Sequence, residues 1–113
     1  MTITAVKPVP TQLLAGSATA LGTPVPSGVV QNLTRVSFAN TDTSAHQVTV
    51  YCVPTSGSPG AGNEVLPATT IQPGQTYVSP ELSGLNMIAG DQLYAFADTA
   101  NKVNITASGV QFS

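Results

Sequence analysis

Residues 29–53 have the sequence VVQNLTRVSFANTDTSAHQVTVYCV. On either side of the segment 40–44, apolar and polar side chains alternate, and this period of two is typical of a β-strand with one buried face. The segment itself, NTDTS, is rich in residues whose short side chains bond their own backbone in turns. We therefore expect an antiparallel hairpin of two strands, residues 29–39 and 46–53.

The same alternation recurs in short runs along the chain, between clusters of proline, glycine, asparagine and aspartate, whereas helical periodicity is nearly absent. Eight strands are predicted: residues 2–6, 17–21, 29–39, 46–53, 65–71, 76–79, 92–97 and 102–112. The pattern indicates an all-β fold, an antiparallel β-sandwich of jelly-roll or immunoglobulin-like type. We divide the chain into an N-terminal arm or first strand, residues 1–12, and a single sandwich domain, residues 13–113.

Several local signals refine this outline. Pro67 confines its strand to an edge or a bulge, because proline cannot donate to a sheet ladder. Residues 54–63 contain no apolar side chain larger than proline or alanine, so we expect a loop there. Pro73 and Gly74 form a turn signature. A capping serine and a first-turn proline predict at most one short helical turn, at residues 80–84.

The last predicted strand shows a change of phase. Apolar residues occupy odd positions up to Ala107, whereas Val110 and Phe112 occupy even positions. A bulge at Gly109 would return both sets to one face, since one extra residue shifts the alternation by one.

Charge is scarce in this chain of 113 residues, which has 7% charged residues and a formal net charge of −2. An average soluble domain has about a quarter. A nucleic-acid binder needs a basic stripe, and three separated cations cannot supply one. Acid–base and metal chemistry need convergent ionisable groups. We expect no nucleic-acid partner, no enzymatic activity, no cofactor and no metal, and we infer that much of the surface is covered by other protein.

The single cysteine and the single histidine share one predicted strand. Cys52 lies on the same face as Val48 and Val50, and we expect a buried, inert thiol there. A lone cysteine cannot form an internal disulfide, so an oxidising compartment is not indicated. His46 is expected to be exposed at the strand end. No apolar run approaches the roughly 20 residues that span a bilayer, and the start does not resemble a secretory signal.

The aromatic residues suggest a second type of site, because β-sandwiches bind sugars in grooves lined by aromatic and amide groups. Phe38 and Phe112 are expected in the core. Tyr51, Tyr77 and Tyr94 remain as possible outward platforms for a glycan, although packing in the core or an interface is the preferred role for each.

Four segments together carry a family resemblance: 36–42 (VSFANTD), 48–54 (VTVYCVP), 71–77 (IQPGQTY) and 89–95 (AGDQLYA). They resemble small virion proteins of tailed bacteriophages that decorate or cement the icosahedral head. The resemblance spans residues 13–112. It implies a sandwich that attaches to assembled capsid protein as a dimer or trimer and strengthens the shell, with no catalytic residues.

The leading hypothesis is thus a virion protein on the capsid surface, made in the cytoplasm of the bacterial host. Its partners would be the major capsid protein or another virion protein and further copies of itself, with no membrane. The alternatives are a tail, neck or fibre component and a host-glycan binding module. Expected contacts lie in an apolar arm, which could add to a neighbour's sheet edge, and in the loop 54–63: Ile3, Val6, Val9, Ser56, Ser58 and Asn63.

Overall fold

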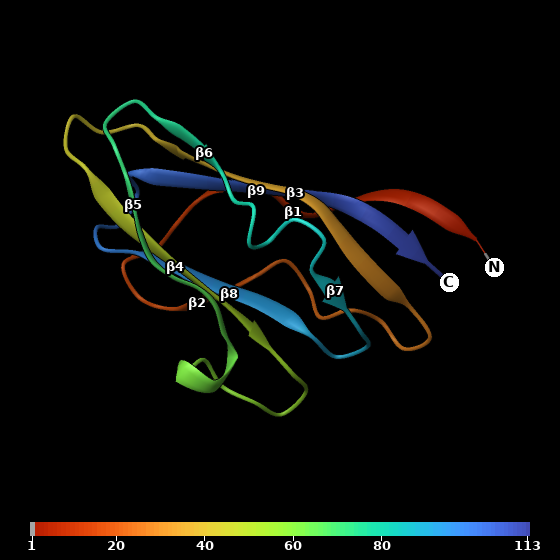
Figure 1. Cartoon of the computed structure of the whole chain (residues 1–113). Helices are drawn as coiled ribbons and strands as arrows, with labels where there is room; N and C mark the ends of the chain where they lie inside the picture. Colours follow the sequence, from red (N-terminus) through yellow and green to blue (C-terminus); the bar gives the residue numbers. More distant parts are fainter. Residues whose placement is uncertain (1) are drawn as a thin grey trace.

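The computed structural model describes residues 2–113 and contains nine strands and one short 3₁₀ turn (Figure 1). The strands are β1 (Ile3–Leu13), β2 (Thr19–Leu21), β3 (Val30–Asn40), β4 (His46–Val53), β5 (Glu64–Ile71), β6 (Thr76–Val78), β7 (Asn86–Met87), β8 (Gln92–Ala97) and β9 (Val103–Phe112). The 3₁₀ turn, η1, spans Ala61–Asn63. The prediction of an all-β fold is confirmed.

Two antiparallel sheets pack face to face. The first has the order β1-β9-β3-β6, with β7 paired to β3, and the second has the order β2-β8-β4-β5. The antiparallel pairs are nested along the chain, because β1 pairs with β9, β2 with β8, β3 with β6 and β4 with β5. A long hairpin rolled up in this way is a jelly roll, one of the two sandwich types that the sequence indicated.

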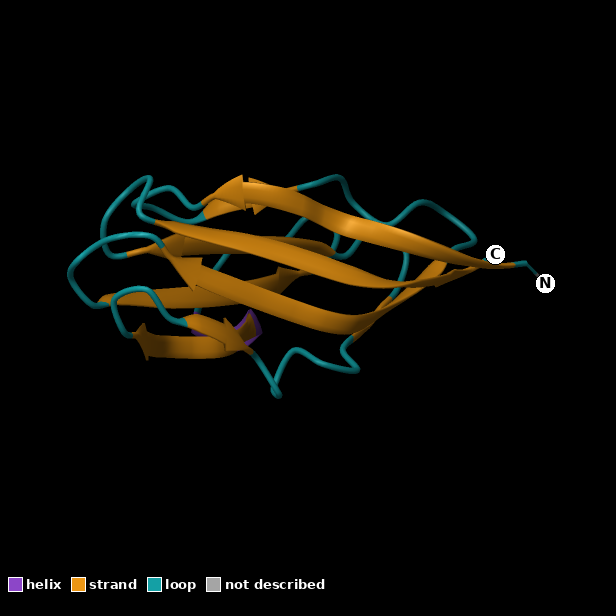
Figure 2. Ribbon diagram, turned by 90° about the horizontal axis from the view of Figure 1, so that it is seen from above, coloured by secondary structure: helices purple, strands orange, loops and turns teal. Residues whose placement is uncertain are grey.

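The core lies between the sheets and is formed by one face of each long strand. Val36 and Phe38 of β3 are fully buried, as are Val48 and Val50 of β4. In β8, Leu93, Ala95 and Ala97 are buried while the alternate residues are half-buried, as the period of two predicts. The molecule is elongated, 46 × 27 × 20 Å, and the strands of the first sheet run to the end where both termini lie (Figure 2).

The predicted hairpin between β3 and β4 is wrong. β3 lies in the first sheet and β4 in the second, so the segment 41–45 crosses from one sheet to the other. The alternation in each strand is real, but the two apolar faces meet across the core instead of lying side by side. Asn40 fixes this crossing, because its Nδ2 donates to the carbonyls of Ser44 and Ile71, both at 2.9 Å.

The predicted bulge at Gly109 is also wrong. β9 keeps its alternation, and the extra residues lie opposite it, in β3 between Leu33 and Arg35 and in β1 between Val6 and Val9. A Cβ on Gly109 would collide with the backbone carbonyl oxygen of Asn32. Glycine is required there by the close approach of the bulged strand.

This correction changes the place of two apolar residues. Because the alternation of β9 continues, Val110 and Phe112 lie on the outer face of the first sheet and are half-buried. The prediction of Phe112 in the core is therefore wrong, whereas Phe38 is fully buried as expected.

The remaining differences are local. β1 continues through Pro8 and Pro10 to Leu13, so residues 3–13 form one edge strand of the first sheet and pair with β9.

Residues 80–84 form a turn without a helix, although the Ser79 hydroxyl accepts the Leu82 N–H as a cap would. The helical turn lies instead within 54–63, as η1. β5 is an edge strand, as Pro67 predicted.

Candidate binding surfaces

A cluster of apolar side chains lies on the outer face of the first sheet at the end that carries the termini. Register places Ile3, Phe112 and Val30 in one row across the strands β1, β9 and β3. Ala5 and Val110 lie opposite each other two residues further along. Ile3 is 64% exposed and Phe112 is half-buried. We call these residues the end patch: Ile3, Ala5, Val30, Val110 and Phe112.

Away from this end the outer face of β9 is polar, whereas the flanking strands expose Leu13 of β1 and Val78 of β6. There β9 presents Asn104, Thr106 and Ser108, and the Thr106 hydroxyl bonds that of Thr11 on β1 at 2.7 Å. At the end itself the inner side is polar, since Gln31 Nε2 donates to Gln111 Oε1 at 3.1 Å. The polarity of the sheet is thus reversed at the end patch, because the bulges leave apolar residues outside and glutamines inside.

The predicted contact residues of β1 are in different environments. Ile3 is exposed in the end patch, and Val6 is half-buried opposite Gly109. Val9 is only 1% exposed and packs in the core, so its side chain is not available to a partner and that prediction is wrong. The segment 2–9 is not a free arm, because β1 pairs with β9 of the same chain.

The predicted contact residues of the loop 54–63 divide in the same way. Ser56 and Ser58 are exposed. Asn63 is half-buried and organises the loop, since its Oδ1 accepts the Gly60 N–H at 3.0 Å and its Nδ2 donates to the Ser58 carbonyl at 2.9 Å. This loop is therefore held by its own hydrogen bonds.

A pocket of about 290 Å³ opens beside this loop, at one end of the second sheet. Its wall combines apolar and hydrogen-bonding groups: Pro24, Val53, Pro54, Thr55, Ser56, Gly57, Gly90, Gln92 and Tyr94. Gly90 lies in the turn before β8 and contacts Thr55 of the loop 54–63. This close approach needs glycine, because the φ of Gly90 is +90° and a Cβ there would collide with the Thr55 hydroxyl. Gln92 Nε2 donates to the Gly22 carbonyl at 3.1 Å, so this amide is already oriented.

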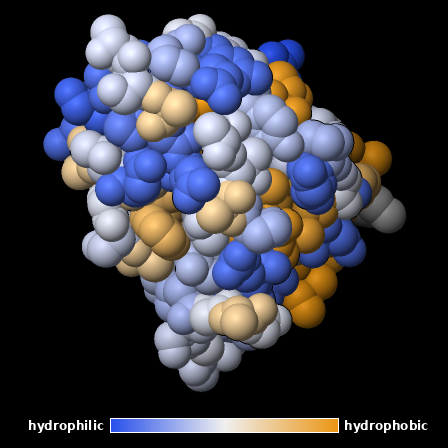
Figure 3. All heavy atoms as spheres, turned by 60° about the vertical axis from the view of Figure 1, so that its left-hand side comes forward, coloured by the Kyte–Doolittle hydropathy of each residue, from blue (hydrophilic) through white to orange (hydrophobic). Residues whose placement is uncertain are grey.

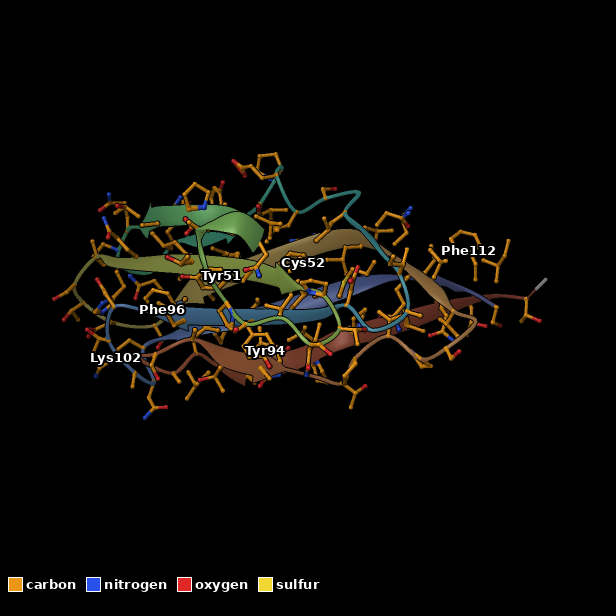
Figure 4. The ribbon with its side chains drawn as sticks, turned by 90° about the horizontal axis from the view of Figure 1, so that it is seen from below. Tyr51, Cys52, Tyr94, Phe96, Lys102 and Phe112 are labelled. Carbon is orange, nitrogen blue, oxygen red and sulfur yellow. The ribbon has the colours of Figure 1, made fainter. Side chains whose placement is uncertain are left out.

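Two of the three predicted glycan platforms lie together beside the pocket. Tyr51 and Tyr94 are cross-strand partners on the outer face of the second sheet, and Tyr51 stacks on Phe96 with ring centroids 6.3 Å apart (Figure 4). Tyr77 lies apart, in the first sheet, where its ring stacks on Phe38 and its hydroxyl donates to Glu81. The alternation in each strand indicates outward positions for Tyr51 and Tyr94, whereas their pairing and the approach of the loops that close the pocket have no sequence signal.

The buried histidine is a feature that the sequence did not reveal. His46 is 6% exposed, so the prediction of an exposed strand-end histidine is wrong. Its Nε2 lies 2.7 Å from Asp42 Oδ2 and its Nδ1 lies 2.7 Å from Asp98 Oδ1. Both carboxylates accept, so the ring must donate from both nitrogens and be protonated. The hydrogen bond to Asp42 raises the pKa of His46 most, and the hydrogen bond to Asp98 raises it further.

This arrangement joins two loops. Asp42 follows β3 and Asp98 follows β8, so the imidazolium links the connection between the sheets to the turn before β9. The hydrogen bond to His46 lowers the pKa of Asp42. Within residues 2–113, no three His, Cys, Asp or Glu side chains are grouped so that they could hold a metal ion.

Cys52 faces the core next to Leu93 and is half-buried. Burial, with a smaller contribution from Asp91, raises the pKa of its thiol to about 11. The thiol is therefore protonated at neutral pH and is a poor nucleophile. In the described part of the chain, no helix is long and apolar enough to cross a membrane.

Six of the eight charged side chains are placed at the margins of the sheets. Across residues 2–113, only Lys7 and Arg35 lie inside strands, and the other charges lie in turns or at strand ends: Asp42, Glu64, Glu81, Asp91, Asp98 and Lys102. Figure 3 shows hydrophobic residues gathered toward one side of the visible face, among neutral and hydrophilic ones. Broad strand surfaces are consequently uncharged.

No protein-family model and no curated protein matches the chain. Among solved structures, it is similar to a protein of Bacillus endospore appendages, described as a novel family of disulfide-linked pili. The TM-score is 0.59 at 12% identity, over 99% of this chain and 88% of that one. A structure of infectious bursal disease virus, Gx strain, gives a TM-score of 0.49 at 12% identity, over 97% of this chain and 31% of that one. The first likeness supports the sandwich fold.

Proposed function

We propose that this chain is a non-catalytic structural protein of a virion, which binds the outside of an assembled phage capsid and stabilises it. The observation that carries the proposal is the position of the charges. Six of the eight lie in turns or at strand ends, so the sheet faces carry almost no charge. Surfaces of this kind suit permanent contact with other protein, because scattered charges are depleted where subunits meet.

The exposed apolar residues support the same role. Ile3 and Leu13 of β1 are at least half exposed, and together with the end patch they leave apolar surface uncovered along the edge of the first sheet. Affinity in an ordered shell comes from many weak contacts made at once. Jelly-roll domains occur in capsid proteins and in lectins, so the fold is compatible with this role.

A component of a tail, neck or fibre would need similar surfaces, and the appendage protein with the related sandwich is described as part of a pilus. The head is preferred because the segments 36–42, 48–54, 71–77 and 89–95 resemble decoration proteins. Both versions share the claim that the protein works as one subunit among many.

Co-sedimentation with purified heads that lack this protein tests the proposal. We expect saturable binding to heads, and no binding to dissociated capsid protein, because a decoration site is formed by several assembled subunits. Binding that never saturates, or that is equal for heads and for beads coated with bovine serum albumin, would contradict a specific capsid site.

A second candidate, glycan binding, is favoured by one observation, the pair Tyr51 and Tyr94 beside the pocket. Sugar rings stack on aromatic faces while hydroxyl and amide groups hold their hydroxyls, and Thr55 with Gln92 would supply such groups. In a glycan array, Tyr94→Ala should lose any binding shown by the wild type, whereas Phe112→Ala, on the outer face of the other sheet, should keep it. Absence of wild-type binding at high protein concentration would dismiss this candidate.

A further inference from the structure

We infer that two copies of this chain pair through the free edges of β1, antiparallel about a two-fold axis at Thr4, so that their end patches join. This inference deepens the proposed structural function and rests on it for its biological role. It names a second copy of the chain as one partner.

Near the start of β1, the backbone groups of two residues, Ile3 and Ala5, do not face β9 and can bond a further strand. Thr2 and Ser113 exchange both of their backbone hydrogen bonds, at 2.8 and 3.0 Å, so even-numbered residues of this segment face β9. In an antiparallel ladder the alternate residues point the other way. The N–H and C=O groups of Ile3 and Ala5 therefore point away from the sheet, at its open edge.

One register uses all four of these groups. If Ile3 faces Ala5 of the second copy and Ala5 faces its Ile3, each pair exchanges two hydrogen bonds, and Thr4 faces Thr4 on the axis. Cross-strand threonine pairs of this kind are favourable. The contact is isologous, because the same surface is used by both copies.

The same register joins the end patches. Ile3 and Ala5 lie on the outer face, so each row of the patch continues into the second copy: Val30, Phe112 and Ile3 of one chain are followed by Ala5 and Val110 of the other. The two patches become one apolar surface across β1, β9 and β3 of both copies. No charged residue belongs to either row, so nothing in the patch opposes its own copy.

The residues that follow Ile3–Ala5 in β1 prevent the pairing of the two copies from extending further along the strand. Lys7, Pro8 and Pro10 follow within a few positions, and register shifts lie between Val6 and Val9 and again after Val9. Lysine, proline and bulges are the devices that blunt edge strands. The pairing is therefore confined to the start of β1 and forms a closed dimer.

Solution mass by light scattering tests this inference. Wild-type protein should have twice the chain mass of 11.5 kDa, and Ile3→Lys should have the mass of one chain. The matched control is Ile88→Lys, at a site that is 58% exposed and outside the patch, and it should stay dimeric. Monomeric wild type over a concentration series, or equal masses for both variants, would overturn the inference, whatever the result with capsids.

A disulfide test locates the axis. In a Cys52→Ala background, Thr4→Cys should form a covalent dimer on mild oxidation, because the Cα atoms of such a pair lie about 4.5 Å apart, within disulfide range. Thr70→Cys, at an exposed position of the other edge strand β5, should not. Equal cross-linking of both variants, or none for Thr4→Cys in a protein of dimeric mass, would contradict the proposed register.

Discussion

Ile3 lies directly opposite Phe112 in the ladder between β1 and β9, and both side chains are on the outer face of the first sheet. The next backbone pair, Thr2 with Ser113, holds the two chain ends together. A row of apolar side chains is thereby placed at the end of the sheet, where neighbouring molecules can reach it. This relationship connects the fold with the proposed role in assembly.

The histidine between two carboxylates predicts a dependence of stability on pH. The pKa of His46 is raised in the folded state, so its contribution is complete below its unfolded pKa of about 6.5 and is lost as the pH rises through the folded value. The pKa of Asp42 is lowered, so its contribution is lost on acidification. Thermal unfolding should give a lower Tm at about pH 9 than at about pH 6.

The variant His46→Gln is the control for this dependence. Glutamine cannot carry the charge that both carboxylates stabilise, so the variant should unfold at a lower temperature at the lower pH and should show a smaller change between the two pH values. A wild-type Tm that rises with pH would contradict the protonated arrangement.

Gly109 should not tolerate a side chain. In Gly109→Ala the new Cβ meets the backbone carbonyl oxygen of Asn32, which cannot move without disturbing the bulge in β3. We expect a loss of about 1–3 kcal/mol in the free energy of unfolding, typical of overpacking. Gly62→Ala, where a Cβ meets no atom within 4 Å, should change it by less than about 0.5 kcal/mol. Urea unfolding of both variants measures the difference.

Asn40 should be needed for the crossing between the sheets. It is 2% exposed, and besides its two donated hydrogen bonds its Oδ1 accepts the Asp42 N–H at 3.0 Å. Asn40→Ala should lower the free energy of unfolding by about 1–3 kcal/mol, because buried backbone groups lose their partners. Asn86→Ala, at an exposed site, serves as the control in the same urea titration. Equal effects of the two variants would show that the crossing does not depend on Asn40.

Much of the fold could be predicted because burial on one face imposes a period of two. Alternation located the long strands, and in β8 it also assigned Leu93 to the core and Tyr94 to the opposite face. Pairing is harder to predict, since the same alternation fits a hairpin and a connection between sheets. The hydrogen bond from Asn40 Nδ2 to the carbonyl of Ile71, at the end of β5 and far along the chain, favours the connection between sheets.

The candidate sites depend on such long-range contacts even more. A bulge at Gly109 would place Phe112 in the core, whereas the bulges lie in the neighbouring strands β1 and β3, and Phe112 lies on the outer face. His46 lies beside Asp98 only because β4 pairs with β8. The pocket at Tyr94 likewise needs two loops that the sequence could identify but not bring together.

The proposed role on the capsid is tested most directly by an electron-microscopy reconstruction of phage particles purified from the cells that produce this protein. We expect a repeated density of a sandwich about 46 Å long on the outer surface of the head, with the end patch covered by protein. Absence of the protein from purified particles, or a density in which both sheet faces are bare to solvent, would contradict the proposed role.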